Sequence, residues 1–274
     1  MKFIPKIILA VLFAVVTANV NAQHTLTKLW TTNATLPVTE SAFFDKTIIY
    51  TSLIDGEPWV KDGKGGVATV SPSGKIINPN WITGLNAPKG LSKLGNILYV
   101  ADMDELIAIN IKAGKIDHRI KISGSENLND VTIDGKGVIY VSDTKLGKVY
   151  KVVNKVSSVA FDNMKGANGL KAIGKKLYIL DGDGMYVSTN GSKPIKITVL
   201  PHGGDGIEPI GNGDFIVTEW DGYFYYVKAN GTKQLLLDTH NSNSRTADIG
   251  YDPATKTVYL PTFSGKSIEA YKLN

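Results

Sequence analysis

Six short motifs recur along the chain, and the first residue of each has a side chain that could contribute to one common site. We call these first residues the marker residues; they are spaced by 37 to 49 positions, and they are Glu40, Lys89, Asn129, Asn168, Asp205 and Ala247. Four of the six carry side-chain oxygens, as two carboxylates and two carboxamides. Carboxylates directed at one point repel each other unless a cation or a proton lies between them. Amide oxygens beside them add neutral donors, and this mixture suits a hard ion such as Ca²⁺.

We therefore expect a divalent cation, Ca²⁺ first, if the fold brings the marker residues together. Zinc is disfavoured because none of the four histidines is a marker residue and the chain has no cysteine. For any single marker residue, the alternative to metal binding is a structural role, since Asn and Asp commonly begin turns. A second series of acids closes the following strand of four units, and we interpret its members as turn-forming residues: Asp102, Asp143, Asp181 and Glu219.

Several other residues are expected near the same point. Trp59 and Trp220 lie in loops that should reach the mouth of the site, where they could stack on a flat ligand or simply pack between neighbouring units. His202 precedes Asp205 by three residues and could accept a proton there, although a lone loop histidine is more often without a role. Asn127 precedes Asn129 by two residues, and Lys89 is itself a marker residue, so both are candidates for contact with substrate or metal.

The repeat that carries the marker residues predicts the fold. Each unit of about forty residues shows alternation of period two, rich in Val, Ile, Tyr and Thr and interrupted by Gly, Asn, Asp and Pro. Four short strands per unit, repeated six times, indicate an all-β, six-bladed β-propeller with four antiparallel strands per blade. The last unit supplies three strands before the chain ends. We expect the strand at about 24–32 to join this last blade and close the ring, which removes exposed sheet edges.

The sequence pattern of the N-terminal segment predicts that the protein is exported. Lys2 and Lys6 precede or flank an apolar run of about ten residues, and small residues end the segment at Ala22. This pattern is typical of a signal peptide at 1–22, with an uncleaved anchor as the alternative. The remainder, 23–274, is predicted to be one propeller domain, periplasmic or secreted, without stable membrane insertion after cleavage.

The composition limits the classes of partner that the protein is expected to bind. The formal charge of +5 falls to +3 once Lys2 and Lys6 are removed, and the remaining cations are scattered along the sequence. A nucleic-acid partner is therefore not expected. Zero cysteines exclude thiol nucleophiles and disulfides. A small-molecule substrate fits the predicted site, whereas the sequence does not indicate the oligomeric state.

The motifs resemble those of the gluconolactonase and senescence-marker-protein (regucalcin) family of six-bladed propellers. The resemblance rests mainly on Ala167-Asn168-Gly169-Leu170 and Gly204-Asp205-Gly206-Ile207. It implies that Glu40, Asn168 and Asp205 bind a divalent ion, that Asn129 contacts ion, water or substrate, and that Asp205 also acts as general base. Two departures are visible: Ser41-Ala42 replaces the Gly-Pro that typically follows the family glutamate, and Asn127 replaces an arginine that many sugar-lactone members carry.

The resemblance implies a lactonase or related ester hydrolase, in which the ion polarises the carbonyl group and Asp205 activates water. Two alternatives remain open at this point. The same mouth could bind a sugar, peptide or protein without catalysis, or it could serve a lyase or condensing reaction. The four oxygen-bearing marker residues favour catalysis, whereas the missing arginine favours the alternatives.

Overall fold

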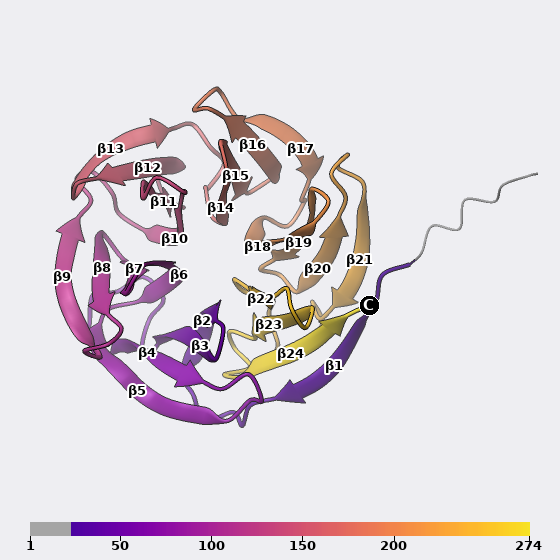
Figure 1. Cartoon of the computed structure of the whole chain (residues 1–274), viewed down its shortest axis with the longest axis horizontal. Coiled ribbons are helices and arrows are strands. Elements are labelled where there is room, and N and C mark those ends of the chain that lie inside the picture. Colours follow the sequence, from indigo (N-terminus) through magenta and orange to yellow (C-terminus); the bar gives the residue numbers. More distant parts are fainter. Residues whose placement is uncertain (1–22) are drawn as a thin grey trace, which may run out of the picture.

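The computed structural model describes residues 23–274, and the predicted signal peptide lies outside these residues. The described residues form six four-stranded antiparallel sheets arranged as a ring, which confirms the predicted six-bladed propeller (Figure 1). Residues 23–274 contain no helix long and apolar enough to cross a membrane.

Five blades are built from consecutive strands. The first is formed by β2 (Val38–Asp45), β3 (Ile48–Ile54), β4 (Gly65–Val70) and β5 (Ile76–Leu85). The second is formed by β6 (Pro88–Leu94), β7 (Ile97–Asp102), β8 (Glu105–Asn110) and β9 (Lys115–Lys121). The third is formed by β10 (Leu128–Ile133), β11 (Ile139–Asp143), β12 (Lys148–Val153) and β13 (Val156–Phe161). The fourth is formed by β14 (Leu170–Ile173), β15 (Lys176–Asp181), β16 (Gly184–Thr189) and β17 (Ile195–Val199). The fifth is formed by β18 (Gly204–Gly211), β19 (Asp214–Glu219), β20 (Tyr223–Val227) and β21 (Lys233–Asp238).

The sixth blade joins the two ends of the described chain. Its inner strands are β22 (Gly250–Asp252), β23 (Thr257–Pro261) and β24 (Ile268–Leu273), and its outer strand is β1 (Leu26–Thr31). β1 pairs antiparallel with β24, from Leu26 opposite Leu273 to Thr31 opposite Glu269. The predicted closure by an N-terminal strand is therefore confirmed, and β1 and β24 lie side by side at the rim (Figure 1).

The hydrophobic core lies between neighbouring blades. One cluster joins the second and third blades through Leu106 and Ile120 on one side and Val131 and Val141 on the other. Similar clusters join the other blades, because each twisted sheet presents one apolar face to the next. Packing of this kind fixes the inner strands around a common axis.

Local irregularities place the marker residues at one end of the inner strands. In four blades the ladder between the first and second strands skips the marker residue and its successor. The register passes directly from Thr39 to Ala42, from Pro88 to Leu91, from Leu128 to Val131 and from Gly204 to Ile207. Such bulges bend a strand and redirect its side chains. The repeated motifs are thus the sequence signature of a repeated bulge.

A glycine after the marker residue permits close approach between inner strands. A Cβ atom at Gly169 would lie 2.0 Å from the backbone oxygen of Asp205, and one at Gly90 would lie 2.3 Å from Asp130 Oδ1. Neither contact is sterically tolerable, so these positions require glycine for packing. In the Asn168-Gly169 pair, Asn168 therefore supplies the polar side chain. Gly169, which has no side chain, allows the backbone of Asp205 to lie next to it.

Candidate functional site

Five of the six marker residues line one cavity of about 510 Å³. Loops of the first, third, fifth and sixth blades complete its wall. The lining residues are Glu40, Pro58, Trp59, Lys89, Asn129, Thr144, Asn168, Asp205, Trp220, Arg245, Phe263 and Ser264. The inner strands that carry the marker residues surround the centre of the ring in Figure 1. We call this cavity the mouth cavity; its size is that of a small-molecule site.

Two oxygens in the mouth cavity are buried without a hydrogen-bond partner. They are Oε2 of Glu40 and Oδ1 of Asn168, which belong to blades one and four. Buried polar atoms are almost always hydrogen-bonded, so two unpartnered acceptors at one site are groups that a cation or a hydrogen-bond donor of a ligand would satisfy. No cluster of three or more His, Cys, Asp or Glu suited to a metal occurs in residues 23–274. A cation here would therefore depend on amide oxygens as well as carboxylates, as the marker residues predict.

Asp205 lies fully buried beside these oxygens. Burial, followed by the charge of Asp248, raises the pKa of Asp205 to about 8; a hydrogen bond from Asn168 and the charge of Lys89 oppose this shift. Burial likewise raises the pKa of Glu40 well above its usual value, with Lys89 opposing and Asp205 adding to the shift. Both carboxyl groups thus lack sufficient positive charge around them. A bound divalent cation would supply it and would favour the ionised forms.

Hydrogen bonds fix the orientation of the Asn129 side chain. Its amide nitrogen donates to Thr144 Oγ1 at 2.9 Å, and Thr144 Oγ1 in turn donates to the carbonyl oxygen of Ala167 at 2.9 Å. Because the nitrogen is committed to this chain, the carbonyl oxygen of Asn129 remains available to accept from a ligand or to bind an ion.

Lys89 supplies positive charge to the mouth cavity, and hydrogen bonds hold its side chain in a fixed position. Its ammonium donates to the carbonyl oxygens of Pro58 at 2.9 Å and Ala87 at 3.3 Å, and it lies 3.9 Å from the centre of the Trp59 ring. Burial lowers its pKa, and Glu40 is the largest of the acids that oppose this. Lys89 therefore holds the Trp59 loop over the cavity and partly compensates the buried carboxylates.

The structure places two of the predicted site residues outside the mouth cavity. Asn127 precedes the bulge of the third blade, and its carbonyl oxygen accepts from the backbone N–H of Thr144 at 3.1 Å. His202 stacks on Tyr223 with ring centres 4.5 Å apart, and its Nδ1 lies 3.8 Å from Asp221. Neither side chain lines the mouth cavity, so a contact of Asn127 or His202 with substrate or metal stays a prediction. Trp59 and Trp220 do line it, as expected.

The second series of acids holds the loops that lead to the marker residues. Asp102 accepts from the backbone N–H groups of Asn86 and Ala87, and Asp181 accepts from that of Lys165. Asp143 and Glu219 accept in the same way from Glu126 and His202. These carboxylates thus tie each connecting loop to the second strand of its blade. The interpretation as structural residues agrees with these contacts.

A second layer of charge lies along the axis below the mouth cavity. Asp248 accepts from Ser41 Oγ at 2.5 Å, Asp130 accepts from the Leu170 backbone at 2.6 Å, and Lys171 forms an ion pair of 2.7 Å with Glu208. Burial raises the pKa of Asp248 to about 7, and it raises that of Asp130 well above its usual value. No sequence pattern pointed to this layer.

The raised pKa values predict how the stability of the metal-free protein depends on pH. Unfolded aspartate titrates near pH ~4, so the folded protein retains protons up to about pH 7 to 8 that the unfolded chain has lost. Stability is then highest at low pH and falls as pH rises, by up to about 1.4 kcal/mol per pH unit for each such group. Urea unfolding in EDTA between about pH 5 and about pH 8 should show this fall, with a shallower slope for Asp248→Asn. A flat or rising profile would contradict the charge arrangement.

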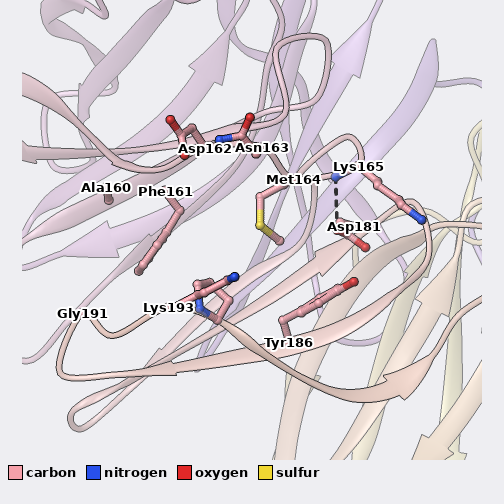
Figure 2. A pocket seen from close by; sticks show the side chains of 11 residues that line it. Ala160, Phe161, Asp162, Asn163, Met164, Lys165, Asp181, Tyr186, Gly191 and Lys193 are labelled. Carbon is pink, nitrogen blue, oxygen red and sulfur yellow. Dashed lines mark hydrogen bonds between the residues drawn. The ribbon is translucent and has the colours of Figure 1, made fainter.

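A second cavity, of about 540 Å³, lies where the third and fourth blades meet. Figure 2 shows Phe161, Met164 and Tyr186 on its wall and the hydrogen bond of 3.2 Å from the Lys165 backbone to Asp181. The Tyr186 hydroxyl donates to Asp183, so this hydroxyl group is satisfied within the protein. None of the marker residues reaches this cavity, and the unpartnered oxygens of the mouth cavity therefore identify the better candidate site.

Solved structures with the same fold include proteins with known activities. A structural-genomics target assigned by inference as a gluconolactonase matches with a TM-score of 0.67 at 14% identity, over 92% of this chain and 93% of that one. A catalytically inactive H270A variant of virginiamycin B lyase from Staphylococcus aureus, solved with quinupristin, matches with a TM-score of 0.61 at 15% identity, over 92% and 100%. A Bacteroides thetaiotaomicron protein of unknown function matches with a TM-score of 0.68 at 12% identity, over 92% and 76%.

These similarities establish the fold. No protein-family model and no curated protein matches the sequence. The similarity in architecture to a gluconolactonase-assigned propeller agrees with the resemblance that the motifs indicate. At such identities the shared architecture says nothing of the reaction. The chemistry of the mouth cavity must therefore be argued from its own residues.

Proposed function

We propose that this protein is an exported, divalent-cation-dependent hydrolase of small lactones or related esters, with Ca²⁺ as the preferred ion. The observation that carries the proposal is the pair of unpartnered buried oxygens, Glu40 Oε2 and Asn168 Oδ1, beside the buried carboxyl group of Asp205. Glu40, Asn168 and Asp205 would hold the ion, with Asn129 next to them. When bound, the ion would act as a Lewis acid toward the carbonyl oxygen. Export rests on the predicted signal peptide at 1–22.

Asp205 is the residue suited to activate water. It is buried, and a hydrogen bond from Asn168 orients its carboxylate. It would take a proton from the water that adds to the lactone carbonyl, and it would return the proton to the ring oxygen as the ester C–O bond breaks. The product is the corresponding hydroxy acid. Trp59 and Trp220 partly cover the cavity and would limit the access of other water molecules.

The lyase neighbour provides a comparison of chemistry. The H270A variant of that enzyme is catalytically inactive. The four histidines of this chain all lie within the described residues, and none lines the mouth cavity. The charged and amide side chains near the unpartnered oxygens are carboxyl and amide groups and the ammonium of Lys89. This composition favours hydrolysis over a histidine-dependent elimination.

Thermal unfolding with EDTA and with excess Ca²⁺ tests the metal. An ion that binds the native state at a hundredfold excess over its dissociation constant contributes about 2.7 kcal/mol, which raises the melting temperature by roughly 5–10 °C. Glu40→Gln should lose most of this increase because it removes one of the ligand charges. Glu57→Gln, an exposed acid in the nearby loop, is the matched control and should respond as the wild type does.

A panel of small lactones and esters, assayed with saturating Ca²⁺, then tests the reaction. Hydrolysis that EDTA abolishes and Ca²⁺ restores is the expected result. No response of the melting temperature to any divalent ion would reject the metal. A metal response without turnover of any lactone or ester would instead indicate a binding protein.

A further inference from the structure

One wall of the mouth cavity has polar groups that the proposed hydrolysis does not use. This wall comes from the fifth and sixth blades, and we call it the anchor wall. Its residues lie in the turns before β20 and β24 and in the segment before β22. They are Trp220, Arg245, Phe263 and Ser264.

Arg245 is held in place but keeps unused donors. Its guanidinium carbon lies 5.0 Å from the centre of the Trp220 ring, and Nη1 donates to the carbonyl oxygen of Asp221 at 3.2 Å and lies 3.6 Å from Asp221 Oδ1. Of the three guanidinium nitrogens of Arg245, Nη1 alone has a polar partner among residues 23–274. The side chain is about a third exposed. Nε and Nη2 are therefore available to a ligand, in the fork that matches a carboxylate.

Strained backbone supports the aromatic part of the anchor wall. Phe263 has a φ of +49°, a conformation that bulky side chains rarely adopt. Its N–H donates to the carbonyl oxygen of Thr39 at 3.1 Å, which couples it to the strand that carries Glu40. Its ring meets that of Trp220 edge to face, with centres 5.5 Å apart. Such strain persists where the surroundings demand it, often at ligand sites.

The charges in the mouth cavity favour an anionic ligand. The lining contains two acids, Glu40 and Asp205, and two bases, Lys89 and Arg245. A divalent ion, as the proposed function requires, would leave the lining side chains with two positive charges in excess, and Asp221, which pairs with Arg245 from outside the lining, offsets one of them. Lys89 is already engaged with two carbonyl oxygens and Trp59. Arg245 is thus the cation left to meet an incoming group.

We infer that Arg245, stacked on Trp220, anchors a carboxylate on the substrate, so that the substrate class is a small lactone or ester that also carries a carboxylate group. The inference rests on the proposed function, since it names the substrates of the same site. Ser264 adds a hydroxyl group to the same wall.

Binding of a stable pair of lactams tests the inference without turnover. The probes are 2-pyrrolidone-5-carboxylate and its neutral twin, 2-pyrrolidone-5-carboxamide, titrated by calorimetry into the Ca²⁺-saturated protein. We expect the carboxylate to bind roughly tenfold to a hundredfold more tightly, the range for a charge-assisted pair. Arg245→Gln should remove this preference, and Arg245→Lys should retain part of it. Arg119→Gln changes the other arginine of the chain, on the second blade, and should bind as the wild type does.

Kinetics give a second readout if lactones are hydrolysed. For a carboxylated lactone, Arg245→Gln should raise KM about tenfold at unchanged kcat, and a neutral lactone should show no change. Equal binding of the two lactams by the wild type, no saturable binding of the carboxylate, or a preference that survives in Arg245→Gln would each overturn the inference. These outcomes are separate from loss of the proposed function, which appears as no response to metal and no turnover. A melting curve for each variant checks that it is folded.

Discussion

Asp205→Asn is expected to lower kcat for lactone hydrolysis by about a thousandfold while leaving the metal-free fold at least as stable as the wild type. General base catalysis contributes about 10²–10⁴-fold, and an amide cannot take the proton. The substitution retains the shape of the side chain and one oxygen for the ion. Activity must therefore be measured at saturating Ca²⁺, so that weaker binding of the ion does not appear as lost catalysis.

Asp205→Asn should lower activity but should raise, or leave unchanged, the stability of the metal-free protein. Burial and the charge of Asp248 raise the pKa of Asp205 to about 8, which means that the ionised carboxylate is costly in the folded, metal-free protein. Asn carries no charge and removes this cost. In EDTA near pH 8, the variant should unfold at the same urea concentration as the wild type or at a higher one. A functional residue that destabilises the metal-free fold is a mark of a site built to receive a cation.

Asp248→Asn is the matched control. Asp248 is also buried, and its pKa is also raised, to about 7, but it belongs to the layer below and does not line the mouth cavity. This variant should gain stability at high pH and retain turnover. Full activity of Asp205→Asn would rule out its role as base. Equal loss of activity in both variants would indicate a general effect of charge along the axis.

The fold could be predicted because the same strand pattern is repeated along the sequence. Six copies of one strand pattern outweigh the ambiguity of any single strand, and the missing outer strand of the last unit pointed to β1 by counting. The marker residues could be predicted for the same reason. Each lies at the same bulge of its blade, so one geometry applies to Glu40, Asn129 and Asp205 alike.

The rest of the site could not be read from the repeat. Arg245 precedes β22 and Phe263 lies between β23 and β24, in connections whose lengths differ from blade to blade, so their approach to the mouth cavity depends on loop paths. Proximity in sequence was equally misleading. His202 lies three residues before Asp205 but stacks on Tyr223 instead. Asp248 follows a marker residue and lies in the layer below, because successive residues of a strand do not face the same way.

Deletion of residues 23–33 is expected to abolish cooperative unfolding, because the ring would then lack its closing strand. β1 contributes the outer ladder to β24. Just beyond it, the Thr32 N–H donates to the carbonyl oxygen of Ile268, and the Ile268 N–H donates to Thr32 Oγ1, both at 2.9 Å. The Trp30 indole donates to the carbonyl oxygen of Pro72 at 3.0 Å in the first blade. Without these contacts, β24 becomes an exposed edge, and the first and sixth blades lose a shared partner.

The contacts of β1 reach both neighbouring blades, and this is why the loss should spread beyond one sheet. Trp30 packs against the cluster that joins the sixth blade to the first, and Leu26 packs against the cluster that joins the fifth to the sixth. Thermal and urea unfolding, followed by tryptophan fluorescence and circular dichroism, should give broad, non-coincident transitions for the truncated chain. Leu29→Ser, at an exposed position of the same strand, should unfold as the wild type does. A synthetic peptide of residues 23–33, added in excess, should restore a single sharp transition. An unchanged melting profile of the truncated chain would show that the ring closes without β1.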